Sequence, residues 1–265
     1  MGPLVFTVTA GRTGTAWLAE LLRRNGLPDA LHEPLGVDDF GVRMPEIRTM
    51  RLFNERGMVP DVAAFWERKL ATLPAEGPYA ETNHTLAKCG LVEALAARRP
   101  AAPVCLVCLR RDRARLAASL LRRGDFANLT LIWQWYLDPA CRRRIVPPEP
   151  LLMAHGPLVG GILWYVLEME ARQAYYALLY GDRFRFLFCE LEELATPEGA
   201  RRLLQALGLP AGQPVLPPCT NATRPAGPEP WRERLQAVVA ALEVDPAAEA
   251  RRFVESGGRL GEPAP

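Results

Sequence analysis

A glycine turn near the N-terminus is the first segment whose residue types could do chemistry. Residues 9–15, with the sequence TAGRTGT, follow a short apolar run with β character and precede apolar residues at helical spacing. Gly11 and Gly14 let the chain fold tightly, so that successive backbone N–H groups and the helix N-terminus behind them face an anion. The pattern predicts a strand, a phosphate-binding turn and a helix.

Three side chains of this turn would add to the anion site. Arg12 supplies a planar positive group, and the hydroxyls of Thr13 and Thr15 supply donors. A Walker A loop needs a lysine and a wider glycine spacing, whereas this turn lacks the lysine and its glycines stand three positions apart. We therefore expect a phosphate or phosphosulfate ligand. The alternative is an ordinary glycine-containing connection between a strand and a helix.

A second strand-and-helix unit carries its own anion-binding residues. The run Val104–Leu109 has β character, and apolar residues at helical spacing follow it within 111–123. Arg111 follows the strand, and Ser119 stands eight residues later, two turns into the helix. An arginine and a serine hydroxyl at these positions can hold a second phosphate. The two units predict a parallel α/β sheet and a ligand with two separated phosphates.

The two motifs together resemble those of the PAPS-dependent sulfotransferase family. Residues 12–17, RTGTAW, resemble the family's 5′-phosphosulfate loop, although Ala16 stands where many members have a second hydroxyl residue. Residues 111–119 resemble its 3′-phosphate motif, in which arginine is followed by Asp or Asn and, after six further residues, by serine. That spacing selects Arg111 over Arg110. The segment 188–194 is similar to the YEDL segment of bacterial members.

The resemblance runs from residue 4 to about residue 240 and implies a fold, a donor and a binding site. The fold would be the P-loop-NTPase-like sulfotransferase fold, an α/β fold with a central parallel sheet flanked by helices, a largely helical second half and a single domain over residues 1–265. The donor would be PAPS (3′-phosphoadenosine 5′-phosphosulfate), with no metal. The residues implied to bind it are Gly11, Arg12, Thr13, Gly14, Thr15, Ala16, Trp17, Arg111, Ser119 and Arg224.

A hydroxyl acceptor needs a general base, and the resemblance offers candidates. Glu33 lies 21 residues after Arg12, where the protein-tyrosine and some carbohydrate branches place an acidic residue. His84 follows the strand before the 3′-phosphate unit, where the cytosolic small-molecule branch places its catalytic histidine. His32 is a third candidate, and Arg12 would carry the positive charge near the transferred group. Which residue is the base stays open, since each could instead cap a loop or make an internal hydrogen bond.

Composition narrows the setting. With 265 residues and 49% hydrophobic content the chain can bury one full core, and a formal net charge of +2 gives no support for binding nucleic acid. The close pair Cys105 and Cys108 is expected to be buried on a strand.

With no charged segment before the first apolar run, we expect a cytoplasmic protein. The long apolar segment 158–180 contains Glu168, Glu170 and Arg172, so no membrane span is expected.

Further elements follow from the same patterns. Additional strands are expected at 79–82 and 184–188, and additional helices at 61–73, 86–99, 129–137, 158–180, 197–207 and 231–242. In the expected helix 129–137, the aromatic residues Trp133, Trp135 and Tyr136 could line an apolar acceptor pocket, or they could belong to the core.

Three functions remain in view at this stage. The first is a sulfotransferase acting on a hydroxyl of a small-molecule or metabolite acceptor and releasing PAP. The second is a small-molecule kinase on the same scaffold, which the missing Walker lysine disfavours. The third is a non-catalytic module that binds PAP or a related nucleotide. The sequence determines neither the acceptor nor the oligomeric state.

Overall fold

A central parallel sheet organises the molecule. The computed structural model describes residues 2–74, 76–127, 137–218 and 230–262. Its five strands lie in the order β2-β3-β1-β4-β5, and every pairing is parallel. Their bounds are β1 Leu4–Thr7, β2 Leu31–His32, β3 Tyr79–Thr82, β4 Val104–Arg110 and β5 Arg185–Glu190. Because all strands run in one direction, the residues that follow them gather at one edge of the sheet.

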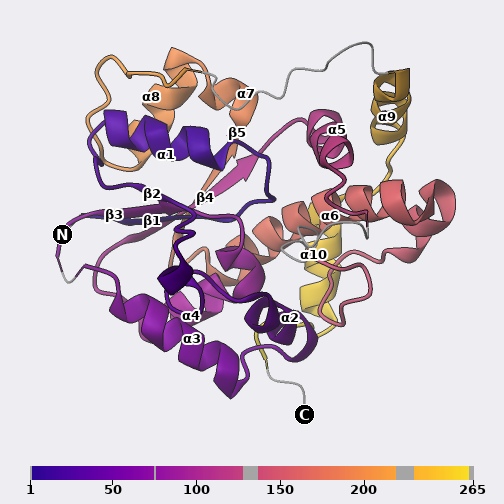
Figure 1. The fold of residues 1–265 in the computed structure, drawn as a ribbon, viewed down its shortest axis with the longest axis horizontal. Helices are drawn as coiled ribbons and strands as arrows, with labels where there is room; N and C mark the ends of the chain where they lie inside the picture. Colours follow the sequence, from indigo (N-terminus) through magenta and orange to yellow (C-terminus); the bar gives the residue numbers. More distant parts are fainter. Residues whose placement is uncertain (1, 75, 128–136, 219–229, 263–265) are drawn as a thin grey trace.

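Helices cover both faces of the sheet (Figure 1). On one face lie α1 (Thr15–Arg24), α7 (Leu191–Leu194) and α8 (Pro197–Ala206). The other face packs against α3 (Pro60–Ala71), α4 (Leu91–Arg98) and α6 (Glu149–Tyr180). The remaining helices are α2 (Ile47–Arg56), α5 (Arg113–Arg123), α9 (Pro230–Ala240) and α10 (Pro246–Glu255), with short 3-10 helices η1 (Val37–Asp39) and η2 (Leu86–Cys89).

The alternation of apolar side chains in the strands explains the two cores. Val5 of β1 and Val107 of β4 pack with the leucines of α1 and α8, while Phe6 and Leu106 pack with the larger core on the opposite face. Both faces of the central strands are therefore buried, as in sheets covered by helices on each side. The α/β architecture predicted from the sequence is confirmed, and so is the largely helical second half.

Most expected elements are present, with several differences. The expected helix 86–99 is two elements, because Gly90 adopts φ 89 between η2 and α4. The elements β2, α2 and α10 were not predicted, and the expected helix 129–137 lies almost entirely outside the described residues. Cys105 and Cys108 are buried on β4 with free thiols, as expected.

Helix α6 is longer than expected and crosses the core. It begins at Glu149 and has a non-helical residue, Gly156 (φ 73, ψ 171), just before the segment predicted as helix. Of the helices in the described ranges, α6 alone has the length and apolarity that a membrane span requires. Its charged pair Glu168 and Arg172 is fully buried and bonded at 2.8 Å, and Glu168 also accepts from two backbone N–H groups. These contacts are those of a core helix whose buried charges are paired within the protein, although Arg172 Nη1 has no hydrogen-bond partner among the described residues.

Candidate functional site

The glycine turn closes in a conformation that its sequence requires. It connects β1 to α1, and two of its residues have positive φ, Arg12 at 69° and Gly14 at 92°. The positive φ of Gly14 favours glycine there, and a Cβ atom at this position would also lie 2.6 Å from Leu191 Cδ1, whose side chain would have to shift. Arg12 has no such freedom, and its left-handed conformation stores strain at a residue expected to function.

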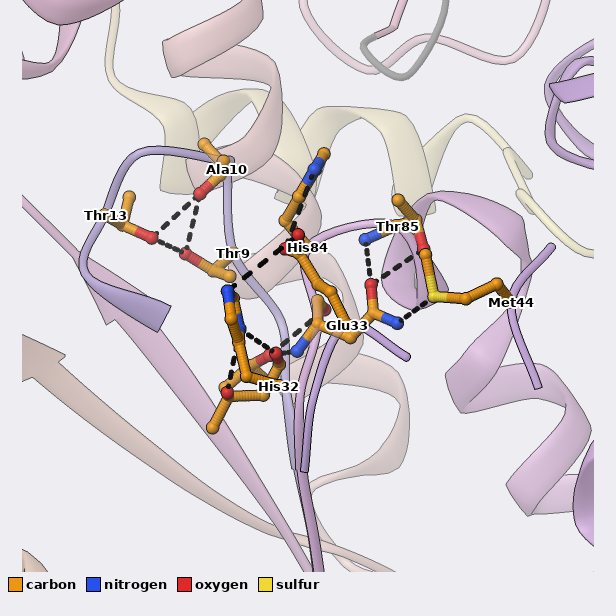
Figure 2. Close-up of polar contacts among 12 residues, drawn as sticks. Thr9, Ala10, Thr13, His32, Glu33, Met44, His84 and Thr85 are labelled. Atoms are coloured by element: carbon orange, nitrogen blue, oxygen red, sulfur yellow. Dashed lines mark hydrogen bonds and ion pairs between the residues drawn. The ribbon is translucent and has the colours of Figure 1, made fainter. Parts of the chain in front are cut away.

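Two threonines lock the turn from within. The Thr9 hydroxyl donates to the Leu109 carbonyl at 2.6 Å and lies 2.6 Å from the Thr13 hydroxyl, which lies 2.8 Å from the Ala10 carbonyl oxygen. Figure 2 shows this cluster. The single proton of Thr13 is therefore used inside the turn, so this side chain fixes the turn's shape. The expectation that its hydroxyl also donates to a ligand stays a prediction.

Behind the turn, helix α1 presents an N-terminus suited to an anion. The cap residue Gly14 makes no side-chain capping bond, and the first turn of α1 carries no acidic side chain. Its first N–H groups, including those of Thr15 and Ala16, have no carbonyl one turn earlier to bond. Trp17 points away from this end, because its Nε1 donates to the Pro217 carbonyl at 3.1 Å. That contact packs α1 against the chain that follows α8.

The structure brings the second motif onto the turn. Arg12 Nε donates to Ser119 Oγ at 3.3 Å, and Arg111 Nη1 donates to the Arg12 carbonyl at 3.1 Å. Asp112 caps helix α5 by accepting from the Arg115 N–H at 2.8 Å, so the residue after Arg111 has a structural role. Arg110 instead bonds Gln173 at 2.6 Å. The choice of Arg111 over Arg110 stays a prediction.

Arg111 is held between the turn and an acidic side chain. Its Nε lies 4.0 Å from Glu192 Oε1 and, among the described residues, has no hydrogen-bond partner although it is buried. Burial lowers the pKa of Arg111, while Glu192 partly opposes that change. The guanidinium remains charged, since an arginine does not lose its proton in proteins. Arg111 therefore keeps an unused donor beside the turn.

The three base candidates lie together rather than apart. Glu33 Oε1 is 3.8 Å from His84 Nε2, and Glu33 Oε2 is 4.0 Å from His32 Nε2. Figure 2 shows the Glu33 carboxylate between the two imidazoles. His32 Nδ1 lies 2.9 Å from the Thr82 carbonyl oxygen, which ties β2 to β3 at this point. Glu33 itself adopts φ 41, the left-handed region that non-glycine residues rarely enter.

Lys88 is a candidate site residue that the sequence reasoning missed. Its Nζ lies 2.6 Å from His84 Nδ1 and donates to Tyr165 Oη at 3.1 Å, and the Gly11 N–H also donates to that oxygen at 3.3 Å. A chain of polar contacts thus joins the base candidates to the phosphate turn. Lys88 is fully buried, in a sequence whose 32 basic residues are otherwise arginine except for Lys69. That rarity was the signal that could have found it.

Burial shifts the ionisation of this group. It lowers the pKa of His84 well below 6.5, and the nearby Lys88 lowers it further. Burial also lowers the pKa of Lys88 well below 10.5, although the charge of Glu33 opposes this. His84 is therefore neutral at pH 7. When Lys88 is an ammonium it can only donate, and in that state Nδ1 of His84 accepts and the ring proton lies on Nε2, facing Glu33.

A buried network fixes the loop that carries His84. Asn83 exchanges hydrogen bonds with Thr7 of β1 and donates from Nδ2 to Glu81 Oε1 at 3.0 Å. Glu81 is in turn paired with Lys69 of α3 at 2.5 Å, with both side chains buried. The backbone before His84 is therefore held by β1 through Thr7 and by α3 through Glu81 and Lys69. These contacts give the imidazole a defined position.

Some predicted residues cannot be placed. Arg224 and the aromatic residues Trp133, Trp135 and Tyr136 lie outside the described residues. Within the described part of the chain, no three His, Cys, Asp or Glu residues are grouped in a way that could hold a metal ion.

Comparisons with known proteins add little to this geometry. No family model and no curated protein matches the sequence. The structure is similar to the crystal structure of a sulfotransferase from Alicyclobacillus acidocaldarius, with a TM-score of 0.49 and 18% sequence identity over 96% of each chain. A likeness of this degree says nothing about ligands or site residues.

Proposed function

We propose that this protein transfers a sulfuryl group from PAPS to a hydroxyl of a small-molecule acceptor and releases PAP. The observation that carries the proposal is the joining of two distant motifs. Ser119 stands 107 positions after Arg12 in the sequence, yet Arg12 Nε bonds its hydroxyl, and Arg111 bonds the Arg12 carbonyl. A ligand with phosphate groups at both ends of a nucleoside would engage both motifs, and PAPS is such a ligand.

The donor would lie against residues whose hydrogen-bonding capacity is unused. These are the N–H groups at the start of α1 and the buried Nε of Arg111. The turn would hold the 5′ end, and Arg111 with Ser119 would hold the 3′-phosphate. Each charge-assisted bond contributes on the order of 1.5 to 3 kcal/mol. When bound, PAPS supplies the activated sulfuryl group.

Glu33 is the base in this proposal, and His84 positions it. With Lys88 charged, the neutral His84 would carry its ring proton on the nitrogen that faces Glu33, and that nitrogen could not accept a proton from an acceptor. The Glu33 carboxylate can accept one. His84 would hold that carboxylate in place through its Nε2–H, and His32 would face its second oxygen. The two candidates that the sequence left open thus act as one unit.

Lys88 would supply a lysine charge beside the glycine turn, which has Arg12 but no lysine of its own. It reaches the turn through Tyr165, whose hydroxyl also accepts from the Gly11 N–H. A buried cation beside the turn stabilises negative charge more strongly than an exposed one, because little water screens it. Arg12 would then stabilise negative charge on the side of the turn that faces Ser119. Lys88 would do so on the side that faces Glu33.

A reducing, cytoplasmic setting suits this chemistry and the cysteines. Cys89, Cys105, Cys108, Cys141 and Cys189 are free thiols, and all but Cys189 are buried. We therefore keep the cytoplasm as the proposed location.

The direct test is calorimetric titration with PAP and with AMP. The wild type should bind PAP more tightly than AMP, since AMP lacks the 3′-phosphate. Arg111→Ala should lose most of that preference while its affinity for AMP changes little. Equal binding of PAP and AMP by the wild type would overturn the proposal, and tight binding of Mg·ATP without PAP binding would favour a kinase.

A further inference from the structure

Three donors near the second motif converge on one carboxylate. Arg115 Nη1 lies 3.6 Å from Glu192 Oε1, Arg111 Nε lies 4.0 Å from the same oxygen, and the Asp112 N–H donates to Oε2 at 3.4 Å. Glu192 belongs to α7, which follows β5 directly. Because β5 pairs with β4 up to Glu190 opposite Arg110, the start of α7 lies beside the segment that follows β4.

These contacts are long, and they leave capacity unused. All three distances exceed the 2.7 to 2.9 Å that is usual for charge-assisted hydrogen bonds. The Arg111 Nε has no hydrogen-bond partner among the described residues, and the side chain of Glu192 is 37% exposed. The carboxylate is therefore held by charge more than by well-formed hydrogen bonds. A phosphate, with more acceptor oxygens and more negative charge, can replace it.

We infer that Glu192 competes with the ligand's 3′-phosphate for Arg111 and Arg115. This inference rests on the proposed function, because it assumes that Arg111 binds that phosphate. In the ligand-free protein Glu192 partly neutralises the two guanidinium groups. On binding, the phosphate displaces the carboxylate, and the returning carboxylate favours release of PAP. Glu192 thus sets how tightly the nucleotide is held.

The charges around Arg111 predict that removal of the Glu192 carboxylate strengthens binding of the phosphate. Arg12, Arg111 and Arg115 bring positive charge to this place, while Asp112 and Glu192 bring negative charge. Asp112 is committed to capping α5, so Glu192 is the acidic group that is free to move away. Replacing its carboxylate by an amide keeps the shape and removes one negative charge from beside the phosphate.

The chain supplies a matched control next door. Glu193 stands one position later in α7 and is also exposed, but it pairs with Arg202 of α8 instead of the arginines of the second motif. Glu192→Gln and Glu193→Gln change the net charge equally. Any effect of overall charge on nucleotide binding will therefore appear in both variants.

The experiment is titration of wild type, Glu192→Gln and Glu193→Gln with PAP and with AMP, with thermal melting to verify folding. Glu192→Gln should bind PAP about three- to tenfold more tightly, the range expected for removing weak, partly exposed ion pairs. Its affinity for AMP should not change. Glu193→Gln should match the wild type with both ligands.

Two results would overturn the inference. Unchanged PAP affinity in Glu192→Gln would mean that the carboxylate does not compete, and weaker PAP binding would mean that it positions Arg111 for the ligand. The proposed function fails by a different result, namely a wild type with no preference for PAP over AMP. A preference that Arg111→Ala abolishes but Glu192→Gln leaves unaltered defeats the inference alone.

Discussion

The two sides of the phosphate turn are built from different chemistry. On one side, Arg12 and Arg111 are partly exposed arginines: Arg12 bonds Ser119, and Arg111 bonds the Arg12 carbonyl. On the other, Glu33, His84 and Lys88 are titratable groups, and burial lowers the pKa of the last two. An arginine keeps its charge whatever its surroundings, whereas the ionisation of histidine and lysine depends on burial. Under the proposed function, groups of fixed charge would bind the nucleotide, and groups whose ionisation depends on burial would handle the proton.

Among the contacts of the described residues, the side chain of Tyr165 links the two sides. Tyr165 of α6 accepts from the Gly11 N–H of the turn and from Lys88 Nζ. A ligand that changes the charge at the turn therefore changes the electrostatic environment of Lys88, which contacts His84. Variants of Glu33, His84 or Lys88 should therefore change turnover. Variants of Arg111 or Ser119 should change nucleotide affinity.

The largest expected effect is on the base. Glu33→Gln should lower kcat by roughly 10² to 10⁴, because the amide cannot accept the acceptor's proton. Calorimetry should find its PAP affinity unchanged. His84→Gln is the paired variant, and as a positioning residue it should reduce kcat less and shift the acidic limb of the pH–rate profile. Full activity in both variants would break the assignment of this side to proton transfer.

Next in size is the effect of Lys88. Lys88→Met should lower kcat by roughly 10² to 10³, the range seen when one preorganised electrostatic donor is removed. PAP affinity should fall much less than kcat, and single-turnover kinetics would separate the two. The other lysine provides the contrast, because Lys69→Met leaves Glu81 buried without its partner and should lose about 3 to 5 kcal/mol of stability instead. A Lys88→Met enzyme with normal kcat would remove the lysine from the mechanism.

A smaller effect is expected on the binding side. Ser119→Ala should weaken PAP binding by about two- to tenfold, equivalent to a neutral hydrogen bond of about 0.5 to 1.5 kcal/mol. AMP binding should stay as in the wild type, and kcat at saturating donor should be retained. If Ser119→Ala lowered kcat with PAP affinity intact, the division between the two sides would not hold.

The smallest expected effect is on stability. The folded protein binds a proton at His84 only below its lowered pKa, whereas the unfolded chain binds it near 6.5. Between those values the unfolded state carries more protons, so the free energy of unfolding rises with pH and falls as the solution is acidified. Between pH 7 and pH 5 the melting temperature of wild type should fall about 2 to 4 °C further than that of His84→Gln. Parallel curves would show that His84 is not held neutral.

The sequence allowed the places of the glycine turn and of Arg111 in the fold to be predicted, while their binding of PAPS stays a prediction. Gly14 and Arg111 stand at strand ends, where local patterns are readable, and parallel strands bring such ends to one edge. The arrangement of Glu33 and His84 was harder to predict. β2 has two residues, too few for any period, and its pairing with β3 is what brings Glu33 to His84. From the sequence alone, Glu33 and His84 were alternative candidates for the base, because one sequence does not show that the loops carrying them lie close together.

Lys88 and Tyr165 could not be assigned from local pattern for a physical reason. Tyr165 lies inside a long apolar helix, where an aromatic side chain is indistinguishable from core packing, and most of its ring does serve that core. Lys88 follows His84 by four residues within a 3-10 helix, and its burial comes from tertiary packing. Only the scarcity of lysine in an arginine-rich chain marked it.

The positive φ angles of Arg12 and Glu33 have a consequence for engineering. Of the three non-glycine residues with positive φ in the described part of the chain, two are these proposed site residues. Glycine at either position would relax the backbone by about 1 kcal/mol, and a selection for heat resistance would reward that change. It would also delete a side chain that the proposed reaction requires. Libraries screened for thermostability alone should therefore accumulate inactive proteins through these two positions, and both should be held constant when the scaffold is stabilised.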